Sequence, residues 1–222
     1  MAARLDKLAR AQLYFVCEAG DDPAALEHTL EAALRGGVNI VQLRDHDASD
    51  DELLAAAPIF RTAADRHDAL FILNDRPDLV AAAGADGVHV GQDDTPVAEA
   101  RAAAGEGAIV GLSSHGPEQL AAALEAQGAA RPDHLSVGPV WATPTKPGRP
   151  AAGLDYVRHA AANAGDLPWF AIGGIDAGNI GEVAAAGASR VVVVRALRDA
   201  PDPEAVAREL RAALPTPVET AR

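Results

Sequence analysis

Eight short apolar runs alternate with alanine-rich helical patterns along this chain of 222 residues. The runs lie at 13–16, 39–43, 70–73, 87–90, 108–112, 134–137, 169–172 and 190–194. Val, Ile and Leu gather in these runs, as they do in short strands buried on both faces, whereas the segments between them have the period of a helix. Eight β–α units permit an open doubly wound sheet or a closed barrel, and eight is the number at which closure is favoured. We therefore predict an α/β fold, a single (β/α)8 TIM barrel.

The length and the apolar content of 49% suit one domain with one core. No Gly/Ser linker or low-complexity segment interrupts the alternation, apart from the Pro-rich loop WATPTKPGRPAAG at 141–153. We predict one barrel domain over 1–222, with an N-terminal extension or helix at 1–11 and a frayed tail at 215–222.

Charge and cysteine content exclude several classes of partner. A formal net charge of -13 argues against nucleic acid or an anionic membrane as the main partner, since both require clustered Lys and Arg. The single cysteine, Cys17, cannot form an internal disulfide, and its apolar surroundings are typical of an ordinary buried residue. The N-terminal stretch MAARLDKLARAQ lacks the apolar core of a signal peptide. We expect a cytoplasmic protein that acts on small molecules, either as a monomer or as a homo-oligomer.

Carboxylates stand just past the third and fourth apolar runs, at Asp75 and Asp94. In a barrel, the residues that follow each strand converge on one rim, where the active sites of this fold lie. Two carboxylates there suggest a hard cation such as Mg²⁺, which needs few protein ligands and leaves room for water and phosphate oxygens. Each acid could instead cap the helix after it, before Pro77 and Pro96.

Other rim positions carry groups suited to phosphate. Gly173 and Gly174 would let backbone N–H groups approach a phosphate at a helix N-terminus, and loops after strands seven and eight often form such a site. A glycine pair is also the ordinary way to turn tightly into a helix. Arg195 could add charge there or only cover the rim, and Arg44 and Lys146 could be anion ligands or solvated surface charges.

Six motifs occur together in one order: VQLRDHD, LNDRPD, GADGVHVGQDD, GLSSH, VGPVWATPTKPG and AIGGI. This series resembles the thiamine phosphate synthase family over roughly residues 12–198, and an ordered set is far more specific than any single motif. The resemblance implies an enzyme that joins 4-amino-2-methyl-5-hydroxymethylpyrimidine diphosphate to 4-methyl-5-(2-hydroxyethyl)thiazole phosphate. The products would be thiamine phosphate and diphosphate, and Mg²⁺ would be required.

The resemblance also implies roles by position. Asp75 and Asp94 would bind the metal, and Arg44, Asn74 and Lys146 would act in catalysis. The Pro-rich loop would serve as a lid that excludes water while a pyrimidine cation exists. Substrate contacts are implied for Gln42, Leu43, Arg44, Asp45, His46, Asn74, Ser113, Thr143, Pro144, Thr145, Lys146, Gly173, Gly174, Val194 and Arg195.

One position departs from the family pattern. The family usually has lysine two residues after the motif arginine, whereas this chain has His46. Lysine would be a permanent charge beside the diphosphate, while an unperturbed histidine is mostly neutral above about pH 6.5. We hypothesise that a nearby diphosphate raises the pKa of His46; equal pH–rate profiles for His46→Lys and the parent would contradict this. The family position of Arg195 is often serine.

Three other functions compete with the synthase. A thiazole tautomerase would need a proton shuttle, for which His115 is a candidate, but would not need the Asn-Asp and Gln-Asp-Asp set. A non-catalytic barrel could bind thiamine precursors as a sensor. An unrelated phosphate-binding isomerase would be indifferent to Mg²⁺. The retained acids and Lys146 favour the synthase over all three.

Overall fold

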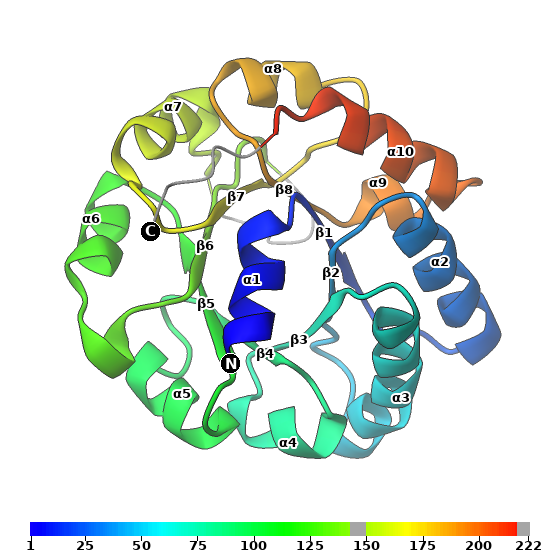
Figure 1. Ribbon diagram of the computed structural model, residues 1–222. Helices are drawn as coiled ribbons and strands as arrows, with labels where there is room; N and C mark the ends of the chain where they lie inside the picture. The colour runs from blue at the N-terminus through cyan, green and yellow to red at the C-terminus, as the bar shows by residue number, and fades with distance from the viewer. Residues whose placement is uncertain (143–149, 217–222) are drawn as a thin grey trace.

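The strands of this protein form one closed parallel barrel in the order β1-β2-β3-β4-β5-β6-β7-β8, seen end-on in Figure 1. The computed structural model describes residues 1–142 and 150–216. The strands are β1 (Leu13–Cys17), β2 (Ile40–Leu43), β3 (Leu70–Asn74), β4 (Gly87–Val90), β5 (Ile109–Ser114), β6 (His134–Val137), β7 (Trp169–Ile172) and β8 (Val191–Val193). The predicted (β/α)8 barrel is confirmed, and each strand ends within two residues of its predicted run.

Helices α2 to α10 surround the barrel, whereas α1 lies across one of its ends (Figure 1). They are α1 (Ala2–Arg10), α2 (Pro23–Arg35), α3 (Asp50–Arg66), α4 (Val80–Ala83), α5 (Val97–Ala104), α6 (Pro117–Glu125), α7 (Gly153–Asn163), α8 (Ile180–Ala185), α9 (Arg195–Arg198) and α10 (Pro203–Ala213), with single 3₁₀ turns η1 (Pro77–Leu79) and η2 (Gly128–Ala130). The sequence did not predict α9, since a single turn directly after a strand is too short to show a helical period.

Side-chain caps define where several helices begin. Asp22 Oδ1 accepts hydrogen bonds from the backbone N–H groups of Ala24 and Ala25 at the start of α2, at 3.0 and 3.1 Å. Ser49 and Glu52 form a capping box at the start of α3. These caps fix the points at which the chain leaves the barrel rim for its return along the outside.

Alternate residues along each strand separate the core into an inner and an outer layer. In β1, Leu13 and Phe15 belong to the cluster that packs against the helices, whereas Tyr14 and Val16 belong to a second cluster with Phe170. Successive side chains of a strand point to opposite faces, so the second cluster fills the barrel interior. Any functional site must therefore lie above this packed interior.

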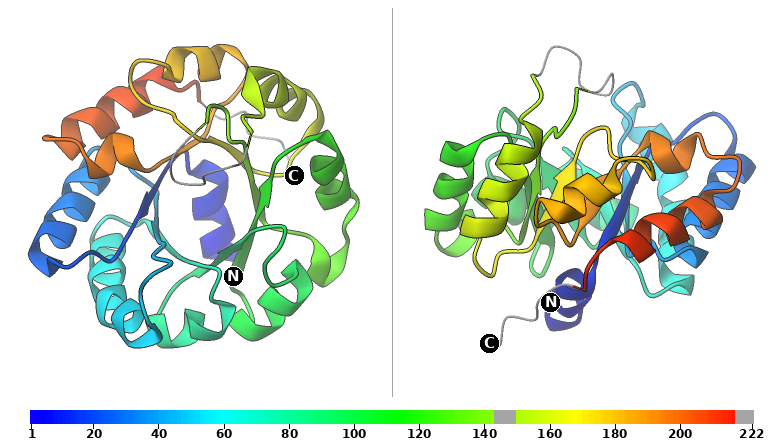
Figure 2. Two further views of the ribbon diagram at one scale, coloured as in Figure 1. Left: turned by 180° about the vertical axis from the view of Figure 1, so that it is seen from behind. Right: turned by 90° about the horizontal axis from the view of Figure 1, so that it is seen from above.

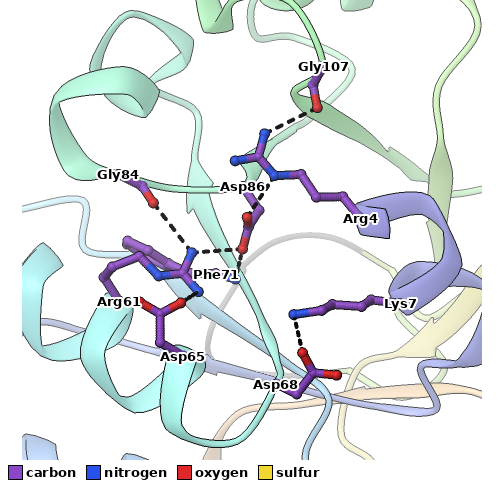
Figure 3. A network of polar contacts seen from close by, with 9 residues as sticks. All are labelled: Arg4, Lys7, Arg61, Asp65, Asp68, Phe71, Gly84, Asp86 and Gly107. Atoms are coloured by element: carbon purple, nitrogen blue, oxygen red, sulfur yellow. Dashed lines mark hydrogen bonds and ion pairs between the residues drawn. The ribbon is translucent and has the colours of Figure 1, made fainter. Parts of the chain in front are cut away.

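Helix α1 covers the end of the barrel at which the strands begin (Figures 1 and 2), and its Leu8 joins the interior cluster. A polar network centred on Asp86 holds it there (Figure 3). The Asp86 carboxylate accepts hydrogen bonds from Arg4 Nε at 2.8 Å, Arg61 Nη1 at 2.8 Å and the Phe71 backbone N–H at 2.9 Å. This end of the barrel is thus occupied by structural contacts.

The outer layer includes Cys17, which is buried as predicted. Burial raises the pKa of its thiol to about 12, with the nearby Glu18 charge acting in the same direction. The thiol therefore stays protonated and unreactive near neutral pH. Within residues 1–142 and 150–216, none of the helices combines the length and the apolar character needed to cross a bilayer.

Candidate active site

A cavity of about 300 Å³ opens where the strands end, opposite α1. Eight of the residues predicted from the sequence line it: Gln42, Arg44, Asn74, Ser113, Gly173, Gly174, Val194 and Arg195. They come from the carboxyl ends of β2, β3, β5, β7 and β8 or from the residues that follow. The structure thus brings together side chains from five strands, as expected for the rim of this fold.

A buried hydrogen bond forms part of the cavity wall. Gln42 Nε2 donates to Tyr14 Oη at 2.6 Å. Burial raises the pKa of Tyr14, and the bond from Gln42 opposes this only in part, so the phenol stays neutral. The Gln42 side chain is therefore fixed at the top of the interior core, where its amide oxygen remains able to accept from a ligand.

Asp75, just after β3, adopts a left-handed backbone conformation with φ of 57°. Aspartate tolerates this region better than most non-glycine residues, and such conformations concentrate at functional sites. Its backbone N–H donates to the His89 carbonyl at 2.9 Å, and its Oδ2 accepts from Asn74 Nδ2 at 2.6 Å. Asn74 therefore links Asp75 to the cavity that it lines.

Asp94 lies in the turn after β4 and is held by that turn's backbone. Its Oδ2 accepts a hydrogen bond from the Gly91 N–H at 2.9 Å. A Cβ on Gly91 would lie 2.6 Å from the same oxygen, so glycine leaves the space that the carboxylate occupies.

The capping interpretation of both acids is wrong. The N-cap residue of η1 is Arg76 and that of α5 is Pro96, and no side chain caps the start of either element by a hydrogen bond. Asp75 and Asp94 therefore do not cap η1 and α5, and their position after the strands has another cause.

Arg44 lines the cavity and interacts electrostatically with both Asp75 and Asp94. Burial lowers the pKa of its guanidinium, while the negative charges of Asp75, Glu18 and Asp94 act in the opposite direction. An arginine stays charged in either case. A permanent positive charge thus lies in the cavity, close enough to both carboxylates to interact with them.

The donor set at this rim fits a magnesium ion. Over residues 1–142 and 150–216, no group of three or more His, Cys, Asp or Glu side chains is placed to hold a metal. Mg²⁺, however, commonly takes one or two carboxylates and completes its shell with water and substrate phosphates. Asp75 and Asp94, which follow the neighbouring strands β3 and β4, match that requirement by the chemistry of their donors.

The glycine pair after β7 turns the chain beside the cavity. Gly173 and Gly174 have φ of 108° and 69°, a region that side chains rarely adopt. A Cβ on Gly173 would also lie 2.5 Å from Pro139 Cβ. Packing alone therefore requires glycine at position 173, and the same turn leaves backbone exposed to the cavity.

Several predicted site residues lie elsewhere. Leu43 is buried in the outer core cluster, and Asp45 accepts hydrogen bonds from the backbone N–H groups of Ala19 and Asp47 at 3.3 and 3.2 Å. His46 is exposed and outside the cavity lining. Thr143, Pro144, Thr145 and Lys146, and with them most of the predicted lid, fall outside the described residues.

Sequence reasoning missed a polar set on the strands themselves. Tyr14, His89 and Ser136 line the cavity from within β1, β4 and β6. His115, which the sequence analysis considered as a proton shuttle, lines it just after β5. His115 Nδ1 lies 2.7 Å from the Gly138 carbonyl oxygen, which requires Nδ1 to be the donor. Polar residues inside otherwise apolar runs, as in LYFV, GVHV and HLSV, were the available signal.

A closed (β/α)8 barrel with a cavity at the carboxyl ends of its strands, lined by polar side chains from several of them, has the architecture of a barrel enzyme. The family profile described as thiamine monophosphate synthase matches residues 13–197. The chain belongs to this family, and the resemblance found in the sequence is confirmed.

Individual relatives agree over nearly the whole chain. The thiamine-phosphate synthase of Thermus thermophilus is 58% identical over 189 residues, which are 85% of this chain and 88% of that protein. That of Acidothermus cellulolyticus is 50% identical over 207 residues, 93% and 96% of the two chains. A solved thiamine phosphate pyrophosphorylase from Pyrococcus furiosus has a TM-score of 0.78 and 30% identity, covering 93% of this chain and 96% of its own. These similarities support thiamine-phosphate synthase function, and the chain is a transferase of thiamine biosynthesis.

Proposed function

We propose that this enzyme joins the pyrimidine diphosphate to the thiazole phosphate in a Mg²⁺-dependent reaction. The observation that carries the proposal is the charge arrangement at one rim, where Arg44 lines the cavity and interacts with Asp75 and Asp94. The glycine pair after β7 and Arg195 after β8 line the opposite side of the same cavity, because β7 and β8 face β3 and β4 across a barrel of eight. Two phosphorylated substrates can therefore meet with their reacting carbon and nitrogen between these two sides.

Asp75 and Asp94 would hold the metal. When bound, Mg²⁺ would offset negative charge on the diphosphate of the pyrimidine substrate. Asn74 holds Asp75 by a hydrogen bond, and the Gly91 N–H holds Asp94, so both carboxylates are oriented before any ligand arrives.

Arg44 would pair with the diphosphate, and Gln42 would accept from the pyrimidine amino group. An arginine in a partly desolvated cavity binds an oxyanion more strongly than one in open water. Lys146, Thr143 and Thr145 stay predicted ligands of the phosphates. Gly173, Gly174 and the backbone at Val194 would receive the thiazole phosphate, with Arg195 supplying charge.

The proposed condensation needs little acid–base catalysis. The bond between the methylene carbon and the diphosphate oxygen breaks with its electrons leaving on the diphosphate, and the pyrimidine amino group stabilises the resulting cation. The thiazole nitrogen then donates its lone pair to the same carbon. Arg44 would stabilise the departing charge, while the apolar interior beneath the cavity, including Val16 and Val192, keeps water from the cation.

The first experiment measures thiamine phosphate formed from both precursors, with Mg²⁺ titrated and with EDTA present. Asp75→Asn and Asp94→Asn should each lower kcat/KM by about 100-fold or more, because each removes a negative ligand from a site with only two. Glu99→Gln is the control, since it removes an exposed charge from α5, which follows the turn with Asp94, and should leave the Mg²⁺ dependence unchanged.

The outcomes separate the competing functions. Product that depends on Mg²⁺ and is lost in both variants would support the proposal. Product formed equally in EDTA would contradict the metal assignment. Folded protein that forms no product, but isomerises a thiazole phosphate in a His115-dependent manner, would favour the tautomerase instead. A cytoplasmic location stays a prediction.

A further inference from the structure

Two histidine rings meet inside the barrel across a glycine. His89 of β4 pairs in register with Gly111 of β5, and Gly111 pairs in turn with His134 of β6, so the three residues form one row across neighbouring strands. A Cβ on Gly111 would lie 2.3 Å from His134 Nε2 and 2.5 Å from His89 Nδ1. The absence of a side chain at position 111 is thus what lets the two rings touch.

Polar contacts continue from this pair to the cavity. His89 Nδ1 lies 3.4 Å from His134 Nε2, and His89 Nε2 lies 3.0 Å from Ser113 Oγ and 3.2 Å from Ser136 Oγ. Ser136 Oγ donates to Ser113 Oγ at 3.4 Å. Ser113, Ser136 and His89 line the cavity, whereas His134 is buried below them with 0% of its surface exposed.

The environment of His134 decides where its proton sits. Its Nδ1 has no hydrogen-bond partner and lies among apolar and aromatic groups, with Tyr14 and Phe170 at ring-centroid distances of 6.0 and 5.8 Å. Burial lowers the pKa of this ring to about 4, so it is neutral at pH 7 and carries one N–H. Nε2 has a partner in His89 whereas Nδ1 has none, and orphaned buried N–H groups are rarer in protein backbones than under-satisfied acceptors. The proton therefore belongs on Nε2, facing His89.

The proton on His134 Nε2 determines which atoms donate and which accept in the other hydrogen bonds of this path. His134 Nε2–H donates to His89 Nδ1, which then holds only a lone pair, and a neutral His89 carries its own proton on Nε2. His89 Nε2–H donates to Ser113 Oγ, which also accepts from Ser136. With both acceptor positions of its hydroxyl oxygen filled, Ser113 has its remaining O–H free to turn toward the cavity.

We propose that His134 is a positioning residue that holds His89 in the Nε2–H tautomer and thereby makes Ser113 a hydrogen-bond donor to the bound pyrimidine substrate. The direct partner would be an acceptor atom of that substrate, such as a ring nitrogen. The tautomer itself follows from the contacts of the protein alone. Only the last step, donation to the substrate, rests on the proposed function.

Nitrogen-15 NMR of the histidine side chains tests the tautomer without any substrate. In the parent, His89 should show a protonated Nε2 and an unprotonated Nδ1. His134→Phe keeps a ring of similar size but removes the donor, and should give His89 a mixture of tautomers. His134→Gln places an amide N–H near the former Nε2 and should restore the parent pattern. His159→Phe, on the outer helix α7, is the matched control and should leave His89 unchanged.

Steady-state kinetics tests the last step. His134→Phe should raise KM for the pyrimidine diphosphate by about 2- to 10-fold with little change in kcat, the worth of one misdirected hydrogen bond. In a Ser113→Ala background, the same substitution should have no further effect on KM, because the hydroxyl that it redirects is gone. A purely structural role would instead give the same loss in both backgrounds.

The NMR and kinetic measurements test separate parts of the proposal. A parent His89 protonated on Nδ1, or a His89 tautomer unaffected by His134→Phe, would overturn the proposal, and the parent spectrum decides this even where a variant does not fold. Equal KM effects in both backgrounds would overturn the step through Ser113. A parent without synthase activity would contradict the proposed function and leave the tautomer result to stand on its own.

Discussion

At the scale of single residues, Gly91 in the turn after β4 leaves the space that the carboxylate of Asp94, a candidate metal ligand, occupies. Gly91→Ala would place a methyl group 2.6 Å from Asp94 Oδ2, which must then leave its hydrogen bond to the backbone. We expect the Mg²⁺ concentration for half-maximal activity to rise by about 10-fold, as for other changes in groups that orient metal ligands. The measurement is the rate of thiamine phosphate formation against Mg²⁺ concentration.

Gly116→Ala is the control for that variant. Gly116 lies in the loop before α6, and nothing is found within 4 Å of a Cβ placed on it. The Mg²⁺ dependence should match the parent. If Gly91→Ala also matched the parent, the turn would not be what places Asp94.

The buried ring of His134 gives the stability of the molecule a pH dependence. Its pKa is about 4 in the folded protein, lowered by burial, against about 6.5 in the unfolded chain. Below pH 6.5 the unfolded chain binds a proton that the folded protein does not, so stability falls as the pH drops from about 6.5 to about 4. The total loss is about 3 kcal/mol, and above about pH 6.5 there is none.

Urea unfolding near pH 7 and near pH 4.5 measures this loss, with His134→Phe as the comparison. The variant should lose less stability than the parent over that interval, by about 2 to 3 kcal/mol. Carboxylates that titrate in the same range contribute to both proteins and cancel in the difference. Equal losses in the two proteins would mean that His134 is protonated in the fold.

At the scale of elements, the attachment of α1 to the barrel depends on Asp86. Asp86→Ala would leave Arg61 and the Phe71 N–H without their acceptor, and we expect the free energy of unfolding to fall by about 2 to 3 kcal/mol. Arg4→Met removes only the contact from α1, whose arginine side chain is 40% exposed, and should cost less than about 1 kcal/mol. Urea unfolding followed by circular dichroism gives both values.

Lys7→Met tests whether removing any charged side chain of α1 lowers the free energy of unfolding. Its partner Asp68 is 79% exposed, so solvent screens the pair and the unfolding midpoint should not move (Figure 3). A loss for Arg4→Met as large as that for Asp86→Ala would show that the helix contact, and not the buried acceptor, is the important part.

The elements also show which features a sequence can predict. Strand positions were readable because each apolar run and each helical period is local, and Asn74 and Asp75 were found because polar residues at the end of a run stand out. The inward residues His89 and Ser136 were missed, because a strand buried on both faces does not reveal which face lines the interior. Leu43 was included through its place in a motif, yet its side chain points to the helices.

At the scale of the whole molecule, the barrel closes only if the side chains of neighbouring strands fit in its interior. The row His89, Gly111 and His134 is one such close fit between side chains, since a Cβ on Gly111 would approach both rings to within 2.5 Å. Gly111→Ala should therefore overpack the interior and lower the free energy of unfolding by about 1 to 3 kcal/mol. The strand backbone itself is not the obstacle, because Gly111 needs no left-handed conformation.

A second substitution shows that the rings are the cause. His134→Ala alone should be destabilising because it leaves a cavity, but in the double variant the methyl group introduced by Gly111→Ala can occupy part of that space. The double variant should then be at least about 1 kcal/mol more stable than the sum of the single losses implies, as measured by urea unfolding of all four proteins. Additive losses would mean that Gly111 is required by something other than the two histidines. A coupling of the expected sign would show that the missing side chain at Gly111 makes room for the ring of His134, the same ring that contacts His89 on the polar path to Ser113.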